Sequence, residues 1–402
     1  MQKDSSWQEE LARGWRLLVA ATIGCGMGAA GIVFYSFGLF VTPLQEAFGW
    51  SRGEVTATMF YGSLGLMLTA LPLGFLIDRR GARVVVLAAI PGLAAALCLL
   101  ARFNGTLPAF YGLFFLTMVA GTGTTAILYT RVVAGRFDTM RGLALGVTLV
   151  GPGTAAVLLP PLLQSLLVAH GWRTGFLVLA LLAFAPWPLV LAWLRPSTAS
   201  APAAHRPEER GMDRGPALRT RTFWTVVVGF GATAVACSAL LVHLVPMLRD
   251  AGVEGLQAAR TASLVGVGVI VSRIGIGWLI DRVFAPSVAT AIFLITAGGC
   301  LLLAVNGIAL APLAAFLIGF SLGAEVDLIA FLTSRYFGLR HYGFLYAIVY
   351  ACFWFGSALG PALAGRLFDR YGDYHYALIL ITALMLFGAA AAASLPRFEQ
   401  QR

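Results

Sequence analysis

The sequence predicts an all-α polytopic membrane protein with twelve transmembrane helices in two pseudo-symmetric six-helix bundles. Three observations support this prediction: the composition, the number of long apolar runs and an internal repeat. The 402 residues are 59% hydrophobic and only 11% charged, whereas soluble domains carry about 25% charged residues. A bilayer core of about 30 Å requires about twenty apolar residues in a helix, and runs of about that length recur along the whole chain.

The apolar runs divide the chain into two halves of six spans, joined by a polar stretch. We expect an N-terminal bundle over residues 1–195, a linker loop over 196–221 and a C-terminal bundle over 222–402. The first run is too long for the core of a signal peptide, so we expect it to be retained. The twelve runs lie at roughly 15–41, 54–77, 84–102, 107–130, 142–168, 173–195, 222–248, 258–280, 286–305, 309–333, 342–368 and 374–395.

The two halves repeat at a nearly constant offset. One set of positions recurs 203 residues later and a second set recurs 201 residues later. In the first set, Pro43, Gly49, Gly74, Asp78 and Arg79 recur as Pro246, Gly252, Gly277, Asp281 and Arg282. In the second set, Gly142, Pro160, Leu166 and Gly171 recur as Gly343, Pro361, Leu367 and Gly372. Two similar six-helix halves are the plan of secondary transporters, whose substrate site lies between repeats near the midplane.

The basic residues indicate the topology. The net charge is +10, and most of the Lys and Arg residues fall in segments that are cytoplasmic if the N-terminus is cytoplasmic. An even number of spans then places both termini and the linker loop on the cytoplasmic side. The excess of positive charge is therefore a property of membrane topology and does not indicate nucleic-acid binding.

Arg273 is the most informative single residue. It lies near the middle of the apolar stretch 265–282, eight residues before Asp281, and so about 12 Å above the helix end at ~1.5 Å per residue. A cation near the midplane costs at least ~2.5–3.5 kcal/mol and needs a partner or a water-filled cavity. We expect the partner to be a substrate carboxylate; the alternative is an internal ion pair that joins two helices.

Glu325 and Asp327 are two acidic residues in the tenth apolar run. Asp327 lies eight residues before Arg335 and therefore at about the depth of Arg273. Residues two apart do not share a helix face, so at most one of the two points into a cavity. A carboxyl group in this position can gain and lose a proton as its surroundings change, which suggests proton coupling. The alternative is a permanent salt bridge to Arg273.

Several other side chains with polar groups lie within or at the ends of the apolar runs. Some tyrosines should line a cavity, and we expect substrate contacts from Tyr35, Tyr129, Tyr346 and Tyr350. His243, near the outer end of the seventh run, is expected to be interfacial, with a gate or proton relay as the alternative. The spacing of Ser51 and Glu54 predicts a capping box at the start of the second run.

The sequence gives no indication of an enzyme, a cofactor or a metal site. It contains no phosphate-binding glycine loop with lysine, no zinc-ligand spacing and no credible Ser-His-Asp set. The five cysteines all lie inside apolar runs and show neither metal-ligand nor disulfide spacing. We therefore expect the partners to be a small organic anion, protons and the lipid bilayer, with no nucleic acid, and we expect the chain to act as a monomer.

The loop between the second and third runs resembles the signature loop of the major facilitator superfamily. It carries Gly74, Asp78, Arg79, Gly81 and Arg83. The resemblance implies that this loop is a conformational latch, together with its partial C-terminal copy at Asp281 and Arg282. A further echo of the motif, Gly365 to Gly372, falls at the outer end of the eleventh run.

Within that superfamily, the chain resembles the group of monocarboxylate transporters and oxalate/formate antiporters. The resemblance rests on the signature loop, the block from Arg273 to Arg282, Arg141–Gly146, Arg335–Gly338 and Tyr342-Gly343. It implies that Arg273 binds a substrate carboxylate.

The sequence differs from this group at two places, which bear on the expected substrate and on the expected route of the proton. Val349 stands where oxalate exchangers have a second cation, which favours a monocarboxylate. Val269 stands where animal monocarboxylate transporters carry an aspartate, and the first run has no internal charge. The proton route of the animal transporters therefore cannot be assumed for this chain. We expect Glu325 or Asp327 to carry the proton instead.

These observations lead to one expected function and two alternatives. We expect a bacterial inner-membrane transporter that moves a monocarboxylate such as lactate or pyruvate together with a proton, by rocking of the two bundles. The first alternative is a drug or metabolite exporter of the same fold, with Arg273 held by Asp327. The second is a non-transporting membrane sensor, which the short loops disfavour because they leave no room for a signalling domain.

Overall fold

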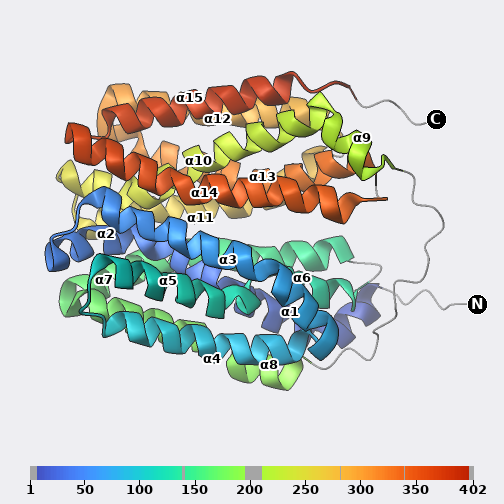
Figure 1. Cartoon of the computed structure of the whole chain (residues 1–402), viewed down its shortest axis with the longest axis horizontal. Helices are drawn as coiled ribbons and strands as arrows, with labels where there is room; N and C mark the ends of the chain where they lie inside the picture. The colour runs from blue at the N-terminus through green and yellow to red at the C-terminus, as the bar shows by residue number, and fades with distance from the viewer. Residues whose placement is uncertain (1–6, 138–140, 195–210, 281, 339, 398–402) are drawn as a thin grey trace, which may run out of the picture. The chain divides into compact units, whose positions relative to one another are not determined.

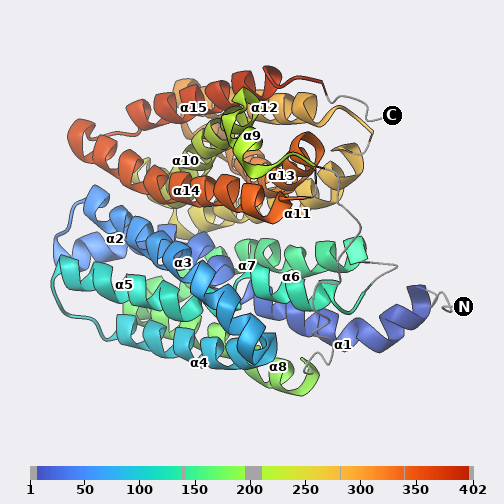
Figure 2. The same ribbon diagram turned by 45° about the vertical axis from the view of Figure 1, so that its right-hand side comes forward.

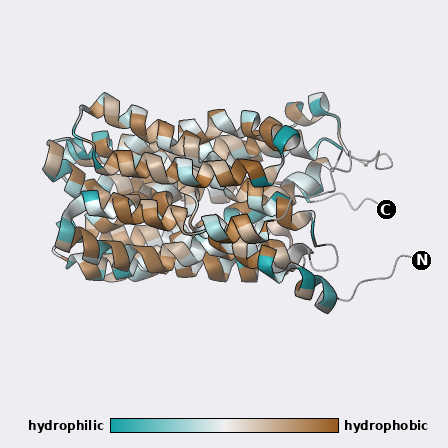
Figure 3. Ribbon diagram, turned by 90° about the horizontal axis from the view of Figure 1, so that it is seen from below, coloured by the Kyte–Doolittle hydropathy of each residue, from teal (hydrophilic) through white to brown (hydrophobic). Residues whose placement is uncertain are grey.

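The computed structural model describes residues 7–137, 141–194, 211–280, 282–338 and 340–397, and this part of the chain is helical almost throughout (Figure 1). Its only β-type pairing is an isolated bridge between Gly211 and Gly338. Apolar residues run along the helices and polar residues gather toward their ends (Figure 3). The predicted all-α membrane fold is confirmed.

Each predicted span is largely helical over its described residues. Eight stretches of the described residues are long and apolar enough to cross a membrane, and the bent pair Glu9–Gly26 and Ala30–Phe48 makes a ninth if counted as one span. Two stretches, Leu143–Trp193 with 51 residues and Ala285–Phe337 with 53, are about twice the length that one crossing requires. Each contains a break at a glycine with positive φ, Gly171 and Gly307, where the chain turns back.

The contacts divide the chain into two compact units. Unit 1 comprises residues 1–49 and 61–200, and unit 2 comprises 50–60 and 201–402. Helix α3 (Arg52–Arg80) therefore starts in unit 2 and continues in unit 1. The boundaries expected at 195 and 222 remain a prediction, since most of the linker lies outside the described residues.

Unit 1 contains most of the first six predicted spans, three of which are interrupted. The first span consists of α1, a π-helical segment η1 and α2, the fourth consists of α5, a 3₁₀ turn η2 and α6, and the sixth is divided between the end of α7 and α8. The bounds are α1 Trp7–Gly26, η1 Ala30–Phe34, α2 Tyr35–Phe48, α4 Ala82–Ala101, α5 Leu107–Gly121, η2 Thr122–Thr124, α6 Ala126–Ala134, α7 Arg141–Phe184 and α8 Trp187–Trp193.

Unit 2 contains the last six predicted spans. Helices α10 and α14 pack against each other, as do α11 and α13, and α12 packs on α15 (Figures 1 and 2). The bounds are α9 Arg214–Arg219, α10 Arg221–Asp250, α11 Gly255–Ile280, α12 Ala285–Asn306, η3 Gly307–Leu310, α13 Ala311–Phe337, α14 Tyr342–Tyr371 and α15 His375–Ala393.

The sequence repeat reappears in the backbone. Gly49 and Gly252 both have positive φ, at 69° and 85°, and Gly171 and Gly372 have φ of 78° and 79°. L-amino acids with a Cβ rarely adopt this conformation, so glycine is required at the same turns in both halves.

Glycines also allow close helix crossings in the first and eighth spans. A Cβ at Gly26 in α1 would lie 2.7 Å from the carbonyl oxygen of Gly151 in α7, and one at Gly268 in α11 would lie 2.6 Å from the backbone nitrogen of Phe320 in α13. Not every glycine of these runs has this role, because a Cβ at Gly275 would meet open space.

Candidate functional site

Arg273 and Asp327 form an ion pair inside unit 2. Arg273 lies on α11 and Asp327 on α13, and Nη1 of the arginine donates to Oδ1 of the aspartate at 3.2 Å. Their side chains are 15% and 27% exposed. The sequence predicted that the two residues lie at the same depth, and the tight packing of α11 on α13 brings them together. The alternative given for Arg273, an ion pair between two helices, is thus present in this conformation.

The pair uses only part of the guanidinium group. The contact is made by one nitrogen to one oxygen, whereas arginine and a carboxylate can form two parallel hydrogen bonds. Nε of Arg273 is buried and has no hydrogen-bond partner among the described residues. Buried donors are almost always paired in proteins, so a buried, unpaired guanidinium nitrogen is a place where an incoming anion gains a hydrogen bond.

Glu325 is fully buried in unit 2 and points to different neighbours from Asp327. Its Oε1 accepts hydrogen bonds from Cys237 Sγ at 3.4 Å and Ser321 Oγ at 3.3 Å, and the side chain of Thr233 is also within reach. Its Oε2 is buried and has no hydrogen-bond partner among the described residues. No cationic side chain of these residues forms a salt bridge with Glu325. The two acidic residues therefore occupy different sites: Asp327 faces the arginine on α11, and Glu325 faces neutral groups from α10 and α13.

Aromatic side chains form a ladder on one face of α14. The rings of Tyr342, Tyr346 and Tyr350 stack at successive centroid distances of 5.5 and 5.4 Å, and the series continues to Phe353 at 6.0 Å. Tyr346 is close enough to interact electrostatically with both Arg273 and Asp327. Two of the tyrosines expected at a substrate site thus lie beside the ion pair or one turn along the helix from it.

The other two tyrosines lie in unit 1. Tyr129 on α6 is fully buried in the core cluster of that unit, and its hydroxyl has no hydrogen-bond partner among the described residues. Tyr35 starts α2, directly after the π-helical segment, and is partly buried. In this conformation Tyr129 contributes to packing. The substrate role of both tyrosines remains a prediction.

The signature loop is described in part. Gly81 has φ of 80° and separates α3 from α4, and Nη2 of Arg83 donates to the carbonyl oxygen of Leu191 in α8 at 2.8 Å. Arg79 and Arg282 are exposed. The surroundings of Gly74, the side chain of Asp78 and the whole of Asp281 lie outside the described residues, and the latch role stays a prediction.

One expectation at the start of α3 is confirmed, and one for a residue of α10 is contradicted. The capping box is present: Ser51 N donates to Glu54 Oε2 at 2.8 Å, and Glu54 N donates to Ser51 Oγ at 3.2 Å. His243 is 2% exposed and hydrogen-bonded to Tyr374, so the expectation of an interfacial histidine was wrong. The sequence patterns did not bring Arg52, Asp250 and Asp369 together as a group, although the motif echo around Asp369 marks one of them.

Ionisable groups buried in apolar helices of a two-unit membrane protein are the features of a secondary transporter, and comparison with known proteins agrees. The family model of the major facilitator superfamily matches residues 23–361, and the chain belongs to this family of membrane transporters. Among the described residues, no group of three or more His, Cys, Asp or Glu side chains could hold a metal ion.

Curated relatives cover nearly the whole chain. Monocarboxylate transporter 11 of Mus musculus is 28% identical over 96% of this chain and 88% of its own length, and monocarboxylate transporter 13 of Bos taurus is 29% identical over 96% and 90%. An uncharacterized MFS-type transporter of Bacillus subtilis, YcxA, is 24% identical over 91% of each.

A solved structure shares the fold. It is a bacterial homolog of the human lysosomal transporter Spinster, in an inward-facing and occupied conformation, with a TM-score of 0.69 and 14% identity over 94% of each chain. At this identity the likeness supports the fold alone, and it agrees with the major facilitator fold expected from the sequence.

Proposed function

We propose that this transporter carries small organic monocarboxylates, of the lactate and pyruvate type, together with a proton. The observation that carries the proposal is the buried guanidinium of Arg273, which is paired through one nitrogen and keeps an unpaired Nε donor. A substrate carboxylate can accept two parallel hydrogen bonds from the guanidinium, which are stronger than neutral ones and fix its orientation. Tyr346 and Tyr350 provide the adjacent apolar and aromatic wall, and Tyr35 and Tyr129 are the proposed contacts from unit 1.

The proton is assigned to Glu325 in preference to Asp327. An ionised carboxylate in a protein interior without a cation costs several kcal/mol, and Glu325 has only neutral neighbours among the described residues. We therefore infer that Glu325 is protonated in this conformation. Asp327 already has a cation beside it and acts as the ion that occupies Arg273 when no substrate is bound.

Coupling to a proton has an energetic reason. A lone anion that enters against a negative-inside potential is opposed by ~2.3 kcal/mol per 100 mV, and a proton moving with it cancels the charge. In this role the chain lies in a bacterial inner membrane with both termini and the linker cytoplasmic, and acts as a monomer by rocking of its two bundles. The curated relatives named monocarboxylate transporters support the substrate class.

Ligand-induced stabilisation of the purified protein tests the substrate class. We expect lactate and pyruvate to raise the thermal unfolding temperature, because a ligand that binds only the folded state stabilises it. Lactamide, the neutral amide of the same size, should have no effect. Arg273→Ala should abolish the response to the acids. Equal shifts with lactate and lactamide would contradict the assignment of Arg273 to the carboxylate.

The Arg273–Asp327 pair itself favours a second candidate, a proton-coupled exporter of drugs or metabolites. In that case the arginine is permanently neutralised by Asp327 and has a structural role. Transport of neutral or cationic compounds that survives in Arg273→Ala together with Asp327→Ala would support the exporter, since the double variant removes both charges without leaving one of them unpaired.

A further inference from the structure

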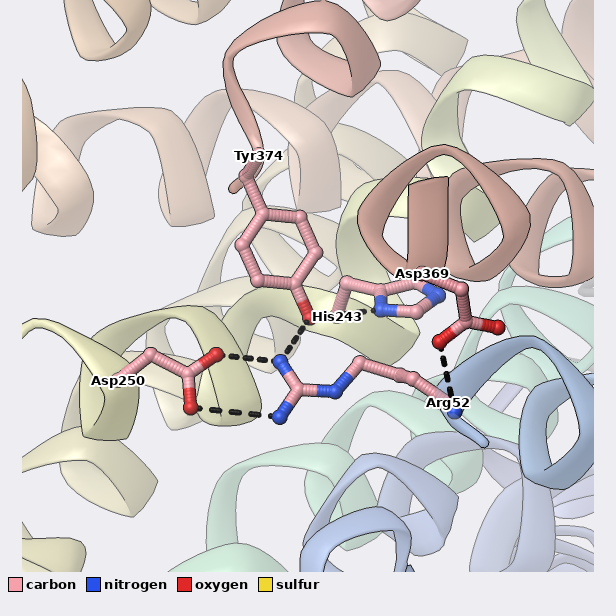
Figure 4. Close-up of polar contacts among 5 residues, drawn as sticks. All are labelled: Arg52, His243, Asp250, Asp369 and Tyr374. Carbon is pink, nitrogen blue, oxygen red and sulfur yellow. Dashed lines mark hydrogen bonds and ion pairs between the residues drawn. The ribbon is translucent and has the colours of Figure 1, made fainter. Parts of the chain in front are cut away.

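The first turn of α3 is held by a network of polar contacts within unit 2, formed by Arg52, His243, Asp250, Asp369 and Tyr374 (Figure 4). These residues come from four parts of the chain: the start of α3, the C-terminal half of α10, the end of α14 and the connection between α14 and α15. We call this group the α3 clasp. It lies apart from Arg273 and Glu325 in sequence, and neither the substrate nor the proton in the proposed mechanism uses it.

Asp369 caps α3 from a neighbouring helix. Its Oδ2 accepts from Ser51 Oγ at 2.8 Å and from Gly53 N at 2.7 Å, and its Oδ1 accepts from Arg52 N at 2.9 Å. The first N–H groups of a helix have no partner within the helix, and a negative charge near them is stabilising. The capping box already satisfies Glu54 N, so α14 supplies the rest of the cap for α3.

The Arg52 side chain makes the second half of the clasp. Its Nη1 and Nη2 both donate to the carboxylate of Asp250, the second at 3.3 Å, and Nη1 also donates to the hydroxyl of Tyr374 at 2.8 Å. The guanidinium carbon lies 3.9 Å from the centre of the Phe368 ring. Arg52 is 6% exposed, so a charged side chain of α3 is buried among groups of α10 and α14.

A directed hydrogen-bond chain extends from Arg52 into the unit. His243 Nε2 lies 2.8 Å from the carbonyl oxygen of Pro361, which can only accept, so Nε2 carries a proton and donates. In the neutral imidazole Nδ1 is then the acceptor, and it receives the hydroxyl proton of Tyr374 at 2.9 Å. The tyrosine oxygen is left to accept from Arg52. Each donor thus has an acceptor, and the network specifies one arrangement of α3, α10 and α14.

We propose that the α3 clasp is a releasable gate. It holds the first turn of α3 on unit 2 in this conformation, and its contacts break when the transport path opens at the end of the molecule where α3 begins. The inference rests on alternating access in the family and on neither the substrate nor the proton site. Alternating access requires the two halves of a transporter to move, and α3 starts in unit 2 but continues in unit 1. A helix shared in this way must release one of its attachments when the halves move.

The composition of the clasp suits a contact that opens. Asp369 is exposed and the Asp250 side chain is 38% exposed, so water can replace their partners on release. The helices cross closely at Gly365, where an added Cβ would overlap Oγ1 of Thr56 and lie 2.8 Å from the Cα of Gly53. A crossing at glycine leaves no bulky side chain to disengage on opening, and the charged groups restore the register on closing.

Cysteine labelling at Thr56 tests the proposal without any transport substrate. Thr56 lies one turn after Arg52 and is fully buried, so a Thr56→Cys side chain should react slowly with a water-soluble maleimide in nanodiscs. Arg52→Ala and Asp369→Asn should each increase its labelling rate by about tenfold or more, the factor expected when hydrogen bonds to charged groups are lost. Arg249→Ala, which removes an exposed cation next to Asp250, is the matched control and should leave the rate unchanged.

Native Cys300 in α12, also fully buried, reports general loss of packing. Unchanged labelling of Thr56→Cys in Arg52→Ala and Asp369→Asn would overturn the proposal, as would an equal rise at Cys300. If either variant fails to reach the membrane, Asp250→Asn is scored in the same way. It removes the charge that pairs with Arg52 and leaves the packing around Thr56 unchanged, so the same selective rise at Thr56→Cys is expected.

Discussion

Replacement of Glu325 by glutamine should uncouple transport from the proton gradient while leaving the substrate site intact. Glutamine has nearly the shape of a protonated glutamate but cannot release a proton. The Oε1 of Glu325 accepts from Cys237 and Ser321, and the amide oxygen of glutamine can accept the same two hydrogen bonds. The change therefore removes the titratable group and preserves its contacts.

The expected magnitudes follow from the burial of the site and from the gradient. In Glu325→Gln the amide NH₂ takes the place of Oε2, which is buried without a partner among the described residues. An unsatisfied buried donor costs about 1–3 kcal/mol, so the variant should lose about that much stability. One pH unit corresponds to 1.36 kcal/mol, about a tenfold concentration ratio for one proton per substrate. Wild type should accumulate lactate about tenfold per pH unit, and Glu325→Gln should only equilibrate it.

Accumulation of labelled lactate in proteoliposomes, with the membrane potential clamped at zero, measures this effect. Exchange of internal for external lactate without a gradient should persist in Glu325→Gln, because neither the arginine nor the aromatic ladder is changed. Glu254→Gln, at an exposed carboxylate just before α11, is the control and should accumulate like wild type. Gradient-driven accumulation by Glu325→Gln at the wild-type level would refute the assignment of the proton to Glu325.

Three further predictions follow. Arg273→Lys keeps the charge but loses the planar pair of donors, so the KM for lactate uptake should rise about 10–100-fold, from ~1.4–2.8 kcal/mol of lost binding; an unchanged KM would contradict carboxylate binding there. Asp327→Asn removes the carboxylate that competes with the substrate for Arg273, so the KM for lactate uptake should fall several-fold. Turnover should slow, because no side-chain anion then takes the place of the substrate on Arg273 when the substrate is released. A raised KM in initial-rate uptake would argue against competition. Tyr374→Phe removes the hydroxyl that both His243 and Arg52 contact, so their buried groups lose a hydrogen-bond partner. Stability should fall by about 1–3 kcal/mol, which should lower the thermal unfolding temperature in detergent. Tyr371→Phe, at an exposed ring, should leave this temperature unchanged.

The membrane fold was predictable from the sequence because the bilayer imposes strong rules on it. A helix must be apolar over about twenty residues to cross, so the spans are visible as runs. The repeat fixed the turns as well, since Gly49 and Gly252 occupy positions of positive φ that a residue with a Cβ rarely adopts. The equal depth of Arg273 and Asp327 followed from helix rise alone.

The remaining features depend on contacts that local patterns do not determine. Residue spacing showed that Glu325 and Asp327 face different directions, but it could not show which neighbour each one meets. The α3 clasp joins Arg52 to residues about 200 and 320 positions away, and no helical periodicity connects them. His243 was expected at the interface because its neighbours in sequence are near a span end, whereas its buried position comes from the packing of α10 on α14.

If Arg273 binds the carboxylate of a substrate that moves with a proton, uptake should depend on both the arginine and the gradient. The decisive measurement is uptake of labelled lactate and a panel of monocarboxylates into proteoliposomes, with and without an inward proton gradient, by wild type and Arg273→Ala. We expect gradient-stimulated uptake by wild type that is lost in the variant. Absence of uptake of every acid by active wild-type protein, or normal uptake by Arg273→Ala, would contradict it.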